Sequence, residues 1–206
     1  LILLNVPVAV SLGLASVIAL ATAKTVPTMV VAQKMFTATD SFPLMAIPFF
    51  MIAGALMERG GISRRLIRFA NSLIGFLPGG LALVTVLASM FFAAISGSSP
   101  ATVAAIGSIM IPGMVRQGYS LEFASATQAS SGCIGVIIPP SIPMITYGVV
   151  TGASIGGLFM AGFIPGLLFG LALMLVAFMV SKRNNYIGSE RPSVTEIWTS
   201  FKDAIF

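Results

Sequence analysis

The sequence predicts an all-α, polytopic membrane protein, and two observations lead to this fold class. Its 206 residues are 57% hydrophobic and only 8% charged, with a mean hydropathy of +1.02, which is far more apolar than a soluble domain. A bilayer core about 30 Å thick needs roughly 20 apolar residues for each spanning helix. Two runs, residues 69–115 and 123–181, contain no charged residue. Each run must therefore cross or re-enter the lipid bilayer more than once.

The charges and the missing residue types exclude several functions. The net charge is +5, but the basic residues cluster at the ends of apolar runs, where they act as topology signals and not as a nucleic-acid patch. The chain has no His and one Cys, Cys133, so a His-based metal site and an internal disulfide are excluded within it. An enzyme would need a nucleophile paired with a base or a metal, and the apolar runs offer neither. We therefore expect no nucleic-acid partner, no enzymatic activity and no cofactor.

The positive-inside rule orients the predicted segments. It places the basic residues of 59–68, Arg116 and the pair Lys182 and Arg183 in the cytoplasm. The expected segments are transmembrane helices over 1–58, a cytoplasmic interfacial helix over 59–76, a hairpin (80–116) and a broken helix (121–152) within 77–152, a transmembrane helix over 153–181, and a cytoplasmic loop with an amphipathic end over 182–206. Residues 1–4 read like the last turn of a truncated helix and the chain stops within an amphipathic stretch, so we expect a fragment of a longer protein.

The hairpin is predicted from a polar break, SGSSP at residues 96–100, between two apolar flanks. Each flank, 80–95 and 101–115, has roughly 16 residues, or about 24 Å of helix, which favours a re-entrant hairpin over two full spans. Ser98 or Ser99 is a good N-cap, and Pro100 fits the first helical position. The second flank therefore begins at the hairpin tip, with its free N–H groups directed into the membrane interior.

The broken helix is predicted from residues that no continuous helix tolerates. These are Gly132, Gly135, Pro139, Pro140 and Pro143, with Ser141 as the expected cap of the half-helix that follows. Helix starts at this depth attract carboxylates, and unwound carbonyls beside them attract small cations. Because the polar groups at both breaks are hydroxyls and main-chain oxygens, sodium coupling is favoured over proton coupling. Close helix packing is the alternative for scattered small residues such as Ser11.

Five longer stretches carry a resemblance to a known family. They are NVPVAVSLG (5–13), SFPLMAIPFFMIAGALMERGGISRRL (41–66), AISGSSPATVAAIGSIMIPGM (94–114), IPPSIPMITYG (138–148) and TGASIGGLFMAGFIPGLL (151–168). Together they resemble the N-terminal half of the large membrane subunit, of the DctM/SiaM type, of tripartite ATP-independent periplasmic (TRAP) transporters. The resemblance implies an elevator-type ion-transporter-like fold of two inverted repeats in the bacterial inner membrane, of which this chain is the first. It also implies that 1–58 belong to a scaffold, which 59–76 link to a moving transport domain.

The resemblance further implies sodium-driven uptake of an organic acid, such as a C4-dicarboxylate or sialic acid. The acid would be delivered by a periplasmic binding protein, and a small four-helix membrane subunit would be the second partner. The sodium positions carried over are Ser96, Gly97, Ser98, Ser99, Gly135, Ile138 and Pro139, and the substrate positions are Ser98, Ser99, Thr102, Pro140 and Ser141. Without the second hairpin and second broken helix the chain is not expected to transport alone. The alternatives are a non-transporting scaffold or assembly subunit and another sodium-coupled carboxylate transporter of similar architecture.

Overall fold

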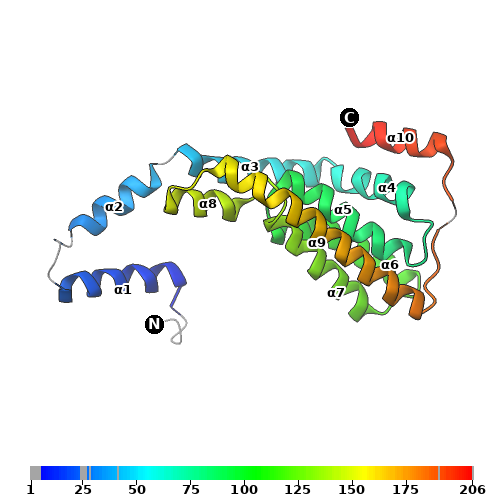
Figure 1. The fold of residues 1–206 in the computed structure, drawn as a ribbon, viewed down its shortest axis with the longest axis horizontal. Coiled ribbons are helices and arrows are strands. Elements are labelled where there is room, and N and C mark those ends of the chain that lie inside the picture. The colour runs from blue at the N-terminus through cyan, green and yellow to red at the C-terminus, as the bar shows by residue number, and fades with distance from the viewer. Residues whose placement is uncertain (1–5, 24–26, 28, 41, 190, 206) are drawn as a thin grey trace. The chain divides into compact units, whose positions relative to one another are not determined.

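The chain is mainly helical in the part that the structure, a computed structural model, describes: residues 6–23, 27, 29–40, 42–189 and 191–205. These residues form ten α-helices and a short 3-10 helix, with no strand among them (Figure 1). The helices are α1 (Val8–Ala23), α2 (Met29–Thr39), α3 (Phe42–Arg59), α4 (Ile62–Ile74), α5 (Gly80–Ser96), α6 (Ser99–Arg116), α7 (Leu121–Gly132), η2 (Cys133–Val136), α8 (Ile142–Thr151), α9 (Ile155–Arg183) and α10 (Val194–Ile205). The predicted all-α class is confirmed. The truncated helix expected at 1–4 lies outside the described residues.

The first of two compact units covers residues 1–45 and contains α1 and α2. Helix α1 is apolar on all sides, and two of its hydroxyl groups bond within the helix. The Ser16 hydroxyl donates to the Leu12 carbonyl at 2.9 Å, and the Thr22 hydroxyl donates to the Ile18 carbonyl at 2.9 Å. Both hydroxyl protons therefore have an acceptor inside the helix. This is needed in a lipid bilayer, where water cannot supply one.

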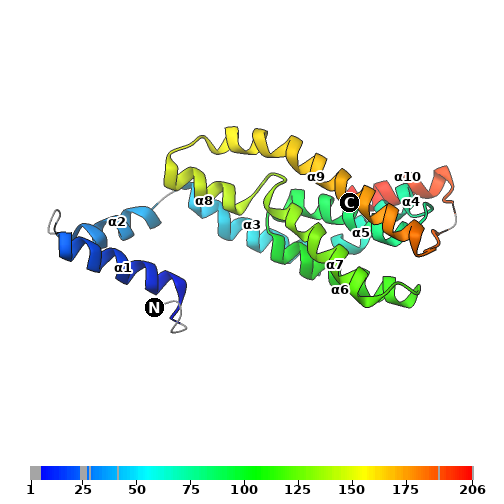
Figure 2. The ribbon, with the colours of Figure 1, turned by 60° about the horizontal axis from the view of Figure 1, so that its bottom comes forward.

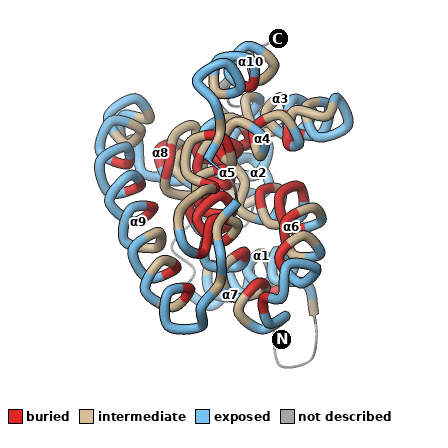
Figure 3. Tube along the Cα trace, turned by 90° about the vertical axis from the view of Figure 1, so that its right-hand side faces the viewer, coloured by how far each residue is buried: buried red, intermediate tan, exposed pale blue. Residues whose placement is uncertain are grey.

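The second unit, residues 46–206, is built around α5. Most of α5 is buried, and Figure 3 shows the buried residues gathered along it. Val84, Ala88 and Phe92 of α5 pack in one cluster with Ile106 of α6 and Leu66 of α4. Helix α4 covers the hairpin because it is strongly amphipathic, with an apolar stripe on one side and arginines on the other.

Helix α9 runs alongside α5 and α7 (Figure 2). Its glycines approach Met90 of α5 and residues 137–144. Gly162, Gly166 and Gly170 are buried and four residues apart, so they lie on one face. A Cβ atom at Gly166 would lie 2.6 Å from the Ile138 side chain, so only glycine permits this approach. The opposite face is exposed and apolar, through residues such as Met160, Ile164, Leu168, Leu171 and Leu175.

One helix of the described chain, α9, is by itself long and apolar enough to cross a bilayer. It has 29 residues and ends with Lys182 and Arg183, the basic pair that the positive-inside rule assigns to the cytoplasm. Residues 29–38 and 43–59 reach that length only if they are taken together as one bent span. Helices α1, α5 and α8 are apolar but shorter.

The segment after α9 passes over the turn between α4 and α5. The Gly79 N–H donates to the Tyr186 carbonyl at 3.0 Å, and the Ser189 N–H donates to the Gly75 carbonyl at 2.9 Å. Helix α10 then packs on α4. It begins with a capping box, in which the Ser193 N–H donates to the Glu196 carboxylate at 2.8 Å and the Glu196 N–H donates to the Ser193 hydroxyl at 3.2 Å.

Candidate functional site

The hairpin tip is a two-residue reversal between α5 and α6. Gly97 adopts a left-handed conformation, with φ of 62°, and its N–H donates to the Ala93 carbonyl at 3.0 Å. Ser98 is the N-cap of α6, where its hydroxyl accepts from the Ala101 N–H at 3.4 Å. Pro100 is therefore the second helical residue, one position later than predicted. The tip serines lie at the start of α6, where the helix carries partial positive charge.

A hydrogen-bond network inside the tip uses the hydroxyls of Ser96 and Thr102, both buried. The Thr102 hydroxyl donates to the Ser98 carbonyl at 2.8 Å and lies 3.3 Å from the Ser96 hydroxyl. Because Thr102 has a single hydroxyl proton, Ser96 must be the donor between these two oxygens. The Ser98 carbonyl also accepts from the Thr102 N–H at 3.0 Å, so both of its lone pairs are used within the tip.

The chain leaves the α-helix a second time after α7. Gly132 ends α7, the 3-10 helix η2 follows, and residues 137–141 are extended or turned before α8 begins at Ile142. Ser141 occupies the N-cap position of α8, as predicted, but its hydroxyl donates to the Val136 carbonyl at 2.8 Å and makes no capping bond. The side chain of Ser141 therefore closes the unwound segment instead of capping the next helix.

The tip and the unwound segment, about forty residues apart in sequence, are in direct contact. The Ile142 N–H donates to the Gly97 carbonyl at 3.2 Å. A Cβ atom at Gly97 would lie 2.5 Å from the Pro140 carbonyl oxygen, and one at Gly135 would lie 2.9 Å from the Ser98 carbonyl and from Ser99 Cα. The starts of α6 and α8 thus meet at one place, and both approaches require glycine.

This contact brings together some of the predicted site residues and separates others. Gly97, Ser98 and Ser99 of the tip lie against Gly135, Pro140 and Ser141. Ser96 and Thr102 are buried and hydrogen-bond within the tip. The Ile138 side chain instead belongs to an apolar cluster with Met90 and Ala93. Pro139 lines an apolar hollow of about 470 Å³ together with α9 residues such as Phe159. For Ile138 and Pro139, the main-chain oxygens are therefore the only atoms suited to a cation.

Gln128 is a buried polar residue near the tip that was not predicted. It lies on α7 with no exposed surface, and its amide nitrogen donates to the Thr102 carbonyl at 3.3 Å. Its amide oxygen has no hydrogen-bond partner in the described part of the chain. A Cβ atom at Gly107 would lie 2.9 Å from Gln128 Cγ, so glycine makes the room for this side chain. The available signal was that Gln128 is the one amide side chain in the uncharged run 123–181.

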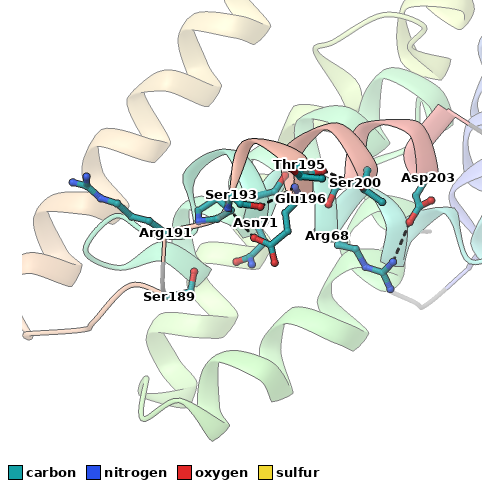
Figure 4. A pocket seen from close by; sticks show the side chains of 12 residues that line it. Arg68, Asn71, Ser189, Arg191, Ser193, Thr195, Glu196, Ser200 and Asp203 are labelled. Carbon is teal, nitrogen blue, oxygen red and sulfur yellow. Dashed lines mark hydrogen bonds and ion pairs between the residues drawn. The ribbon is translucent and has the colours of Figure 1, made fainter.

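Charged side chains are gathered elsewhere in this unit. A cavity of about 760 Å³ between α4 and α10 is lined by polar residues, among them Arg68, Arg191, Glu196 and Asp203, and by no residue of the tip (Figure 4). Across the described residues, no three His, Cys, Asp or Glu side chains come together as a metal site. The tip itself offers hydroxyls, carbonyls and helix N-termini.

An all-helical chain with an apolar exterior and a helix long enough to span a bilayer has the features of an integral membrane protein. Residues 1–206 match the family model described as the tripartite ATP-independent periplasmic transporter, DctM component. The chain belongs to this family of transporter components, and the resemblance drawn from the five motifs is confirmed.

The chain is similar in sequence to TRAP permease proteins from several bacteria. The chain is 54% identical over 190 residues to the isethionate TRAP transporter permease protein DctMQ of Oleidesulfovibrio alaskensis, covering 92% of the chain and 30% of that protein. It is 49% identical over 175 residues to the C4-dicarboxylate TRAP transporter large permease protein DctM of Pseudomonas aeruginosa, covering 85% and 41%. It is 41% identical over 173 residues to the sialic acid TRAP transporter large permease protein SiaM of Vibrio cholerae, covering 84% and 40%. The chain thus spans less than half the length of these relatives.

Proposed function

We propose that the protein containing this chain takes up an organic acid by sodium-coupled secondary transport across the bacterial inner membrane. The observation that carries the proposal is the contact between the hairpin tip and the unwound segment, where the starts of α6 and α8 meet without a charged side chain. The printed names of the relatives support the substrate class, because isethionate, C4-dicarboxylates and sialic acid are all organic acids.

The chemistry of the tip suits a sodium ion together with an anion. Sodium is a hard cation that takes oxygen ligands, and the Ser98 and Ser99 hydroxyls and the carbonyls of 137–141 are neutral oxygens. The partial positive charge at the two helix starts favours a carboxylate. A cation and a carboxylate 4 Å apart attract each other by about 4 kcal/mol at an effective dielectric constant near 20. Each would therefore strengthen binding of the other, which couples uptake to the sodium gradient.

Two partners and a movement between segments of the chain complete the proposed transporter. The acid is delivered by a periplasmic binding protein, and a small membrane subunit completes the transporter. The hairpin and the broken helix move as an elevator against a scaffold that includes residues 1–58, with residues 59–76 as the connecting arm. A non-transporting scaffold subunit is the competing hypothesis, as is another sodium-coupled carboxylate transporter.

The test is uptake into proteoliposomes that contain the full-length permease, its small membrane subunit and the cognate binding protein. Radiolabelled isethionate, C4-dicarboxylates and sialic acid are supplied separately, with and without an inward sodium gradient. The expected result is uptake of one acid that requires both sodium and the binding protein. Absent uptake with all components present supports the scaffold hypothesis, and uptake without the binding protein supports a different transporter class.

A further inference from the structure

We propose that Arg64 and Arg65, at the start of α4, bind the phosphate of an anionic phospholipid in the cytoplasmic leaflet. The site is a hollow of about 520 Å³ at the α3–α4 turn, lined by Gly60, Gly61, Arg64, Arg65, Arg68 and Asp203. None of these residues belongs to the hairpin tip. The lipid site is therefore independent of the proposed sodium and substrate site.

The charges that line the hollow do not balance. Arg68 forms an ion pair with Asp203, with Nη1 and Oδ2 3.3 Å apart (Figure 4). In the part of the chain that the structure describes, Arg64 and Arg65 form no ion pair. Three arginines therefore face one carboxylate, which leaves two positive charges for a negatively charged ligand. Guanidinium groups bind phosphate well because their N–H groups form a planar fork.

The main chain adds to this preference. Helix α4 has 13 residues and follows Gly60 and Gly61, and its start has no side-chain cap. The first-turn N–H groups of an uncapped helix carry partial positive charge and favour an anion. The arginines are held on a fixed element, because Leu66 and Ala70 on the other face of α4 are buried in the hairpin core.

An apolar surface leads to the hollow along α3. Ile52 and Leu56, one turn apart, are 56% and 66% exposed, and the helix ends at Arg59 beside the α3–α4 turn. A phospholipid fits both features, because its acyl chain can lie on the apolar surface of α3 while its phosphate binds the arginines. A soluble anion fits the arginines alone. The positive-inside rule places this turn in the cytoplasm, and the cytoplasmic leaflet carries anionic lipids.

The test uses the full-length permease, reconstituted in phosphatidylethanolamine nanodiscs that contain increasing phosphatidylglycerol. Native mass spectrometry counts the phosphatidylglycerol molecules retained. The double variant R64Q/R65Q is expected to bind phosphatidylglycerol roughly thirtyfold more weakly, since each basic residue near a membrane surface contributes about a fivefold factor. R64K/R65K keeps both charges and is expected to recover most of the binding. D203N frees Arg68 and is expected to increase it.

The matched control is R116Q, which removes an exposed arginine from the end of α6 and is expected to leave retention unchanged. Equal retention in R64Q/R65Q and the unchanged protein would overturn the proposal. An equal loss in R116Q would also overturn it, because general surface charge would then explain binding. Soluble glycerol 1-phosphate is the last arm: if it displaces phosphatidylglycerol at equal concentration, the site holds a free anion and not a lipid. Melting temperatures of all variants verify that each one is folded.

Discussion

At the scale of single residues, two glycines control the contact between the hairpin tip and the unwound segment. Gly97 has a positive φ and faces the Pro140 carbonyl, and Gly135 faces the main chain of Ser98 and Ser99. A side chain at either position would occupy the space of the opposite main chain. The proximity of the two helix starts, on which the proposed sodium and carboxylate site depends, is therefore set by the absence of two Cβ atoms.

Gly97→Ala is expected to separate the tip from the unwound segment. The left-handed conformation alone costs an alanine about 1 kcal/mol, and the Cβ at 2.5 Å from the Pro140 oxygen requires a main-chain shift in addition. We expect a lower melting temperature and loss of sodium-stimulated uptake. Gly118→Ala is the matched control, because Gly118 has a φ of 86° with nothing within 4 Å of its Cβ position. If both variants show the same small decrease in melting temperature and transport normally, the contact between the tip and the unwound segment is not needed for transport.

Ser98→Ala and Ser99→Ala test the tip hydroxyls. Ser98 caps α6 through the Ala101 N–H, so its removal should reduce stability by about 1 kcal/mol. If both hydroxyls ligate sodium, the sodium concentration for half-maximal uptake rises in both variants while membrane insertion is unchanged. Ser108→Ala serves as control, because in the described part of the chain the Ser108 hydroxyl bonds only to the Ala105 carbonyl within α6. Unchanged sodium activation in both tip variants would remove these serines from the site.

At the scale of elements, α6 and α7 are joined by a polar contact that is only half satisfied. The Gln128 amide nitrogen reaches the Thr102 carbonyl in the first turn of α6, while its amide oxygen is buried with no partner among the described residues. A buried acceptor without a hydrogen bond costs roughly 1–3 kcal/mol. The donated bond, at 3.3 Å, contributes less than a short hydrogen bond would. The side chain therefore positions α6 but does not stabilise the fold strongly.

Gln128→Met is expected to leave the free energy of unfolding unchanged or to raise it by about 1 kcal/mol. Methionine has nearly the same volume and removes the unpartnered oxygen together with the weak hydrogen bond. Thermal unfolding of the purified permease measures the effect, with Gln117→Met at the exposed end of α6 as control. A large loss of stability confined to Gln128→Met would show instead that the bond to Thr102 holds α6 and α7 together.

At the scale of the whole molecule, the second unit has a polar surface at its α4–α10 end and an apolar surface along α9. The polar end carries the arginines of α4, the Arg68–Asp203 ion pair and the cavity beside α10. Along α9 the exposed side chains are apolar over most of the helix. This division is what a bilayer requires, because charged groups are stable only where water or headgroups reach them.

Leu171→Lys tests whether α9 crosses the membrane. Leu171 is exposed near the middle of α9, where replacing leucine by lysine raises the apparent insertion free energy by about 3 kcal/mol. Met179→Lys is the control, since Met179 is equally exposed but one turn from Lys182, where a lysine reaches the interface at little cost. A glycosylation-based insertion assay measures both. Equal insertion of the two variants would contradict a spanning α9.

The helices of this protein could be predicted because their signals are local. The predicted flanks 80–95 and 101–115 lie within α5 and α6, because the SGSSP sequence contains the turn glycine, the capping serine and a proline that fits the first turn of a helix. The amphipathic arm over 59–76 corresponds to α4, whose apolar stripe repeats at helical spacing. The residues of the tip were likewise predicted from its polar composition.

Only the tertiary structure decided which of these elements meet. Gly97 faces Pro140 and Gln128 reaches Thr102 because segments 43 and 26 residues apart pack closely. Ser141 donates to Val136 because of the shape of the unwound segment. The sequence by itself determined the all-α membrane class, because its long uncharged apolar runs require helices in a bilayer. Hydropathy and capping act within one helix, whereas contacts between helices are selected by the shapes of both surfaces, and no local pattern contains that information.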